Sequence, residues 1–201
     1  MKYLIYYFLI ILSLTSCNFL AKKIFGISEL KKFDQKKYSI FIQKIKNSKI
    51  DFQEFVADTS NLKNNLKLVN SKRWKKNLYQ PCQILYFLND SLISFHANCF
   101  ASQGLKVNWN KNNRFNSFIP ESAVIIDSVD IGLLKFKENY ILPISSNKKY
   151  TVLVFWSLMM ESASKKEIET VFNNLIKFNK EEETNVYLIN LDKVYSQIYY
   201  Q

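Results

Sequence analysis

The C-terminal third of the chain alternates between continuous apolar runs and a helical pattern. Tyr150–Trp156 is an unbroken run of aliphatic and aromatic residues, as expected for a strand buried on both faces. Residues 186–191 form a second such run. Between them, apolar residues recur at helical spacing: Ile168, Val171, Phe172, Leu175 and Ile176. This order predicts a strand, a helix and a strand joined by a right-handed crossover, with the two strands parallel.

The start of this helix carries a candidate N-cap. Ser162 or Ser164 can cap it, and Glu167 stands where a capping box would place the partner of Ser164. We expect Glu167 and Glu169 to lie on the polar face of the helix. No pair of carboxylates converges in a way that predicts general acid or base catalysis.

Residues 82–100 contain two apolar runs separated by Asn89, Asp90 and Ser91, a pattern typical of a β-hairpin. A two-residue loop at Asp90-Ser91 makes one face apolar throughout and puts Cys82 opposite Cys99.

Directly opposed cysteines are close enough for a disulfide bond, and we favour a structural Cys82–Cys99 bridge. Two buried free thiols are the next interpretation, and a catalytic dithiol is the last. His96, the only histidine, falls on the other face of the strand and is expected at the surface, so no metal site is predicted.

The upstream part of the chain is less regular. Apolar residues at mixed three- and four-residue steps between residues 24 and 50 predict one or two amphipathic helices. Residues 123–129 and 131–136 have the composition of short strands. We expect an α+β or α/β fold, with a mixed sheet, a βαβ unit at the C-terminus and a helical N-terminal region.

Composition places the chain among ordinary globular proteins. Its 201 residues are 48% hydrophobic and 22% charged, which excludes overall disorder, and the 3 Gly and 3 Pro argue against a turn-rich β-sandwich. The formal net charge is +11. Residues 21–80 hold 15 Lys and Arg against 5 Asp and Glu, whereas residues 81–201 hold 12 of each sign. We favour a solvated helical region over a specific lipid-binding patch for the basic segment.

The N-terminus has the layout of a secretory signal. Lys2 precedes an apolar run over residues 4–14, and small residues follow. That run makes a helix of only about 16 Å, too short to cross a hydrocarbon core of about 30 Å. An exported chain is not expected to bind nucleic acid.

Leu14-Thr15-Ser16-Cys17 resembles the lipobox of bacterial lipoproteins. The resemblance implies that residues 1–16 are removed and that Cys17 becomes the acylated first residue of the mature protein. Several acyl chains suffice for stable anchoring. We therefore expect a lipid-anchored protein on the extracytoplasmic side of the membrane, periplasmic or at the outer membrane. Its two parts would be a basic, mainly helical region over residues 17–80 and an α/β domain over residues 81–201.

The segment over residues 150–192 resembles the first βαβ unit of thioredoxin-like thiol-disulfide oxidoreductases. Phe155-Trp156 at the end of the first strand, the helix with Lys166-Glu167, and Leu191-Asp192 after the second strand all match. The family places a Cys-x-x-Cys motif where this chain has Met160, Glu161, Ser162 and Ala163. Met and Ala supply no thiolate, so the resemblance implies the fold and the partner-docking loop over residues 158–163 without the redox activity.

The family also carries a cis-proline loop and a ββα tail after this unit, and the chain has no proline beyond Pro143. The unit is therefore either truncated or completed by upstream strands such as the hairpin. We expect binding or scaffolding at the cell envelope, with no cofactor and an envelope protein as a possible partner. The alternative is an envelope thiol-disulfide protein that uses Cys82 and Cys99.

Overall fold

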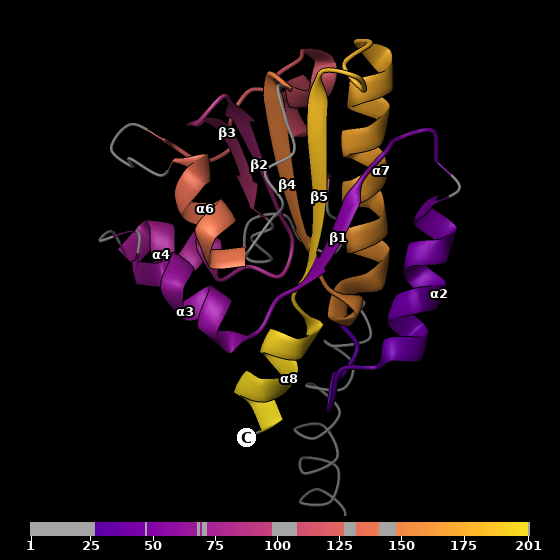
Figure 1. Ribbon diagram of the computed structural model, residues 1–201, viewed down its shortest axis with the longest axis vertical. Coiled ribbons are helices and arrows are strands. Elements are labelled where there is room, and N and C mark those ends of the chain that lie inside the picture. The colour runs from indigo at the N-terminus through magenta and orange to yellow at the C-terminus, as the bar shows by residue number, and fades with distance from the viewer. Residues whose placement is uncertain are drawn as a thin grey trace, which may run out of the picture.

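The computed structural model describes residues 27–46, 48–67, 69, 72–97, 108–126, 132–140 and 148–200. Its centre is a five-stranded mixed sheet of order β1-β5-β4-β2-β3 with helices on both faces (Figure 1). The strands are β1 (Gln53–Val56), β2 (Gln83–Leu88), β3 (Ser91–Ala97), β4 (Tyr150–Trp156) and β5 (Thr184–Asn190). The fold class is therefore mixed α/β, as expected.

The predicted strand-helix-strand unit is confirmed. β4 and β5 pair in parallel, with Leu153 opposite Tyr187, and α7 (Glu161–Lys177) connects them. Side chains of β4 alternate between two apolar clusters, one on each face of the sheet. Leu153 and Phe155 belong to one cluster, and Trp156 belongs to the other. Burial on both faces explains why this strand has no polar alternation.

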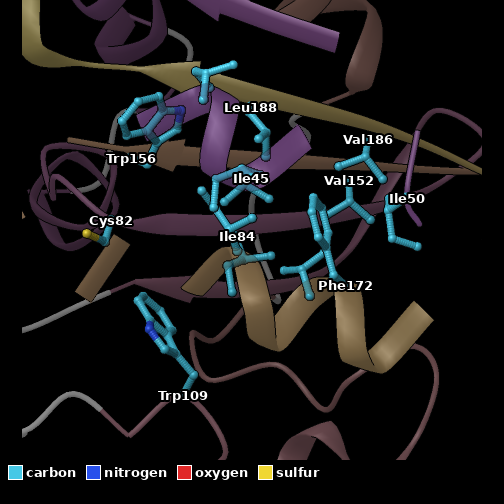
Figure 2. Packing of buried hydrophobic residues seen from close by; sticks show 14 of the residues in the cluster. Ile45, Ile50, Cys82, Ile84, Trp109, Val152, Trp156, Phe172, Val186 and Leu188 are labelled. Carbon is cyan, nitrogen blue, oxygen red and sulfur yellow. The ribbon is translucent and has the colours of Figure 1, made fainter. Parts of the chain in front are cut away.

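Each face of the sheet has its own set of helices (Figure 1). α2 (Gln35–Lys46) and α7 cover the face that contains Trp156. α3 (Thr59–Lys67), α4 (Lys72–Leu78), α6 (Leu133–Tyr140) and α8 (Asp192–Tyr200) cover the other. Figure 2 shows the cluster on the face that contains Trp156, where Phe172 of α7 lies among Ile84, Val152 and Val186 of three strands.

The hairpin is present, but its predicted register is wrong. Leu88 pairs with Ser91, so Asn89 and Asp90 make the turn rather than Asp90 and Ser91. Asn89 has a φ of 52°, the left-handed conformation that such a turn needs and that asparagine tolerates. The prediction assumed that the correct register is the one that makes a single face apolar throughout. Because β2 lies inside the sheet and is buried on both faces, that assumption does not hold.

The hairpin adds two upstream strands to the sheet that contains β4 and β5. β2 is antiparallel to β4, with Leu85 opposite Leu153, and β3 follows it at the edge of the sheet. The opposite edge is β1, a strand that the sequence analysis did not predict, which pairs in parallel with β5. The basic region over residues 17–80 thus contributes a strand to the same sheet as the C-terminal segment.

The predicted strand over residues 131–136 is wrong, because Leu133–Tyr140 forms helix α6. Leu133, Phe136 and Tyr140 recur at steps of three and four and are buried against the sheet. That spacing is helical, and it outweighs the β-branched composition at the start of the segment.

Candidate functional site at the start of α7

The loop between β4 and α7 occupies the position that the resemblance assigns to a docking loop. It consists of Ser157 and the short 3-10 helix η2 (Leu158–Met160), after which α7 begins at Glu161. Met160 is only 2% exposed and Ala163 is half-buried, while Glu161 and Ser162 are exposed. Of the four predicted loop residues, Glu161 and Ser162 are thus the accessible ones.

The predicted capping box is not formed. The residue before α7 is Met160, whose side chain makes no capping hydrogen bond. Ser164 is instead buried and holds the loop: its Oγ accepts from the Ser157 backbone N–H at 3.1 Å and donates to the Ser157 carbonyl at 2.8 Å. The serine therefore links the first turn of α7 to the end of β4.

Asp192 fixes the same loop from the end of β5. Its Oδ1 accepts from Ser157 Oγ at 2.6 Å and from the Leu158 backbone N–H at 2.8 Å, and its Oδ2 accepts from Asn190 Nδ2 at 3.0 Å. Burial raises the pKa of this carboxyl, while its hydrogen bonds act in the opposite direction. The result is a loop held rigidly by polar groups that are themselves buried.

Cys82 lies directly behind this loop, at the start of β2. It is a buried free cysteine whose Sγ is 3.4 Å from Ser164 Oγ. Burial raises the pKa of the thiol well above its ordinary value, and the nearby Glu167 carboxyl raises it further. The observed register, with Gln83 opposite Ala97, removes the alignment from which the Cys82–Cys99 disulfide was predicted. Cys99 and Cys17 lie outside the described residues, so the disulfide and the lipidation stay predictions.

Glu167 is buried completely, and its predicted place on a polar helix face is wrong. Neither carboxyl oxygen meets hydrogen-bond geometry with a partner in the described part of the chain, although the Cys82 thiol lies beside it. Burial raises the pKa of the Glu167 carboxyl well above its ordinary value, because a buried carboxyl favours its neutral, protonated form. The sequence does hold a signal: Glu167 precedes Val171 by four residues and so shares its buried face.

His96 is also buried, at 2% exposure, so its predicted surface position is wrong. Its Nε2 lies 3.0 Å from Ser94 Oγ, and its ring packs against Phe115 with centroids 4.8 Å apart. Burial lowers the pKa of His96 to about 3, and the Arg114 charge adds to this effect. Among the described residues, no group of three or more His, Cys, Asp or Glu is placed to hold a metal ion.

The N-terminal segment over residues 27–34 covers the loop from outside. The Ser28 backbone N–H donates to the Met159 carbonyl at 2.7 Å, and Leu30 and Phe33 pack against the cluster that contains Met160. α2 continues this cover, because Phe41 stacks on Trp156 with ring centroids 4.5 Å apart. The loop is therefore closed on two sides by residues that precede the sheet in sequence.

Comparison with known proteins assigns the chain to no family. No protein-family model matches the chain, and neither a curated protein nor a solved structure matches it. Along the described residues, no helix combines the length and apolar character that spanning a membrane requires.

Proposed function

We propose that the protein is a lipid-anchored protein of the cell envelope whose thioredoxin-like domain binds a partner and performs no thiol exchange. The observation that carries the proposal lies at the start of α7. Met160 and Ala163 stand where the resembling family has its two thiols, and the loop around them is ordered by Asp192 and Ser164. A loop held in place without a nucleophile suits recognition rather than catalysis.

The sheet supports the thioredoxin-like part of this proposal. In the resembling family a hairpin follows the βαβ unit, in the ββα tail. Here the hairpin β2–β3 precedes the unit in sequence and pairs antiparallel with β4, on the side away from β5. β2 and β3 therefore stand, beside β4, where the resembling family has its antiparallel hairpin.

The Cys82 thiol, which lies in the described part of the chain, lacks the properties that thiol-disulfide exchange requires. A reactive thiol is a thiolate, favoured by a helix N-terminus or a nearby cation and open to solvent. Cys82 is fully buried, its pKa is raised, and the ionisable groups that act on it, Glu167 and Asp192, are acids rather than bases. These facts favour the non-catalytic proposal over a thiol-disulfide protein that uses Cys82 and Cys99.

Thiol labelling of the full chain tests the absence of exchange. We expect Cys82 to resist alkylation in the folded protein across redox buffers of differing potential and to react, directly or after strong reduction, only once the chain is unfolded. The double substitution Met160→Cys and Ala163→Cys is the matched positive control, since it places two thiols at the start of α7. Rapid, reversible labelling of Cys82 in the otherwise unchanged chain would refute the proposal.

Anchoring and partner binding are tested in cells. Cys17→Ser is expected to move the protein out of the membrane fraction, and mass spectrometry is expected to find acyl chains on residue 17 of the unaltered chain. A photo-crosslinking amino acid at position 162 should capture a discrete envelope protein, whereas the same probe at the exposed position 182 should not. Equal capture from both positions would remove the docking role of the loop.

A further inference from the structure

We infer that the end of the domain at which β1, β4 and β5 finish faces an anionic lipid bilayer and contacts it through helix α8 and the turn before β2. We call this end of the domain the basic end and define it as residues 27–37, 57–60, 75–82, 157–166 and 192–198. The inference rests on the proposed lipid anchor and adds an orientation and a lipid-contact surface to it.

The elements of the basic end meet in space because of the sheet register. β4 and β5 are parallel, so the loop after β4 and helix α8 after β5 both begin at the end of the sheet where these strands finish. β2 runs the opposite way, so the turn before it, which contains Tyr79, lies there too. Tyr195 of α8 donates from its hydroxyl to the Tyr79 carbonyl at 2.8 Å, and Figure 1 shows α8 and the start of α2 at this end.

Charge is distributed unevenly along the molecule. The basic end contains nine lysines and five acidic residues, of which Asp192 is buried. The opposite end, over residues 44–54, 89–90, 148–150 and 177–184, contains seven lysines and six acidic residues. Of these two ends, the basic end therefore carries the larger excess of positive charge, while Lys63, Lys67, Lys72 and Arg73 on α3 and α4 add positive charge outside both ends. Near an anionic surface each such lysine contributes about 1 kcal/mol of attraction.

Apolar side chains accompany this charge. Tyr79 is 39% exposed and Ile198 is 38% exposed, and the contact between Tyr195 and Tyr79 brings the two sites together. Exposed aliphatic and tyrosine side chains among lysines are the combination that settles at the headgroup level of a bilayer.

The segment that links the proposed lipid anchor at Cys17 to the domain joins the domain at the basic end. Ser28 is bonded to the Met159 carbonyl at the basic end, and it follows Cys17 by eleven residues. A chain of that length spans at most roughly 36–40 Å, which keeps the basic end within reach of the lipid. A protein partner that contacts Ser162 would then be met at the bilayer surface.

The test uses the full chain isolated with its native lipid and reconstituted into vesicles. One set contains phosphatidylcholine alone, and the other contains phosphatidylcholine with 30% phosphatidylglycerol. Hydrogen exchange is read by mass spectrometry in both, after flotation confirms attachment. We expect amides in residues 79–82 and 192–198 to exchange several-fold more slowly in the anionic vesicles, an effect lost in 1 M salt, with no change in residues 177–184.

The triple substitution Lys75→Glu, Lys76→Glu and Lys193→Glu should abolish that protection. The control, Lys44→Glu, Lys49→Glu and Lys177→Glu, makes the same change in charge with exposed lysines of the opposite end and should retain it. Unchanged exchange in β4 shows that each variant is folded. If the protein attaches to both kinds of vesicle but shows no extra protection from exchange in the anionic ones, the orientation is overturned and the lipid anchor is retained. If it floats with neither kind of vesicle, both the orientation and the lipid anchor are overturned.

Discussion

At the scale of single residues, burial shifts the pKa of an acid and that of a base in opposite directions. Glu167 lies behind the loop after β4, beside Cys82, and His96 lies on β3 against Phe115. Burial disfavours the charged form of both, so the pKa of the acid rises and the pKa of the base falls. The two groups therefore couple stability to pH in opposite directions.

Replacing Glu167 by Gln should remove a loss of stability at neutral pH. The unfolded chain releases this proton near the ordinary value of 4.5, while the folded protein retains it. Stability is thus full below that pH and falls as pH rises toward the folded pKa, by up to about 1.4 kcal/mol per pH unit. Urea unfolding at pH 4.5 and pH 7.5 should show the variant gaining relative to the unaltered protein at the higher pH.

Glu169→Gln is the matched control for this experiment, because Glu169 is exposed on the same helix and pairs only with Lys165 at 3.7 Å. Its effect should be small at both values of pH. An identical pH dependence in the Glu167→Gln variant and the unaltered protein would mean that the carboxyl reaches water.

His96 should not titrate in the folded protein between pH 8 and pH 4. It is the only histidine, so its imidazole carbon-bound protons can be followed by NMR without ambiguity. The unfolded chain takes up a proton near pH 6.5, whereas the folded protein does so near pH 3. Stability is therefore present above about 6.5 and is lost as pH falls toward 3. A folded-state titration near pH 6.5 would place the ring at the surface.

At the scale of elements, the loop after β4 is held by the buried Asp192 carboxyl together with Ser157, whose Oγ also accepts from the Met159 backbone N–H at 3.1 Å and so caps η2. Asp192→Ala leaves the Ser157 hydroxyl and the Leu158 N–H without their buried acceptor. We expect a loss of about 2–3 kcal/mol in the free energy of unfolding and faster hydrogen exchange at Leu158. Asp51→Ala, at an exposed position, should change neither. A Leu158 amide that stays protected would show that Ser164 holds the loop alone.

The same scale shows which elements the sequence could predict. α7 was predictable because its apolar residues keep a helical period over several turns, and β4 and β5 were predictable because each is a short continuous run of aliphatic and aromatic residues. The hairpin was predictable, but its register was not, because strands buried on both faces carry no alternation to select it. β1 has four residues and half-exposed positions, too few to form a pattern.

The candidate site was predictable in place but not in content. The resemblance located the loop at Met160–Ala163. The hydrogen bonds of Ser164 and Asp192 to Ser157 were not predictable, because they form only once the ends of β4 and β5 and the start of α7 meet in the fold. Glu167 was assigned to solvent because acidic residues are seldom buried without a partner. Only the position of Val171 one turn later contradicted that assignment.

At the scale of the whole molecule, the basic region and the C-terminal segment form one sheet and one pair of clusters. β1 pairs with β5, and Tyr38 and Phe41 of α2 stack on Trp156. The division at residue 80 is a division of charge and composition. The packing crosses it, and the residues that follow the proposed anchor most closely in the described part of the chain cover the loop that the proposed partner would meet.

A fragment of residues 81–201 should therefore fail to fold cooperatively. Removing α2 and β1 uncovers Trp156 and Phe172 on one face of the sheet and leaves β5 as an open edge. We expect the fragment to lack near-UV circular dichroism and to bind hydrophobic dyes, whereas residues 27–201 should unfold in one sigmoidal transition. A sigmoidal transition of the fragment with a native near-UV signal would show that residues 81–201 fold independently of the upstream residues. Residues 27–34 could then detach from the loop after β4 without unfolding the domain.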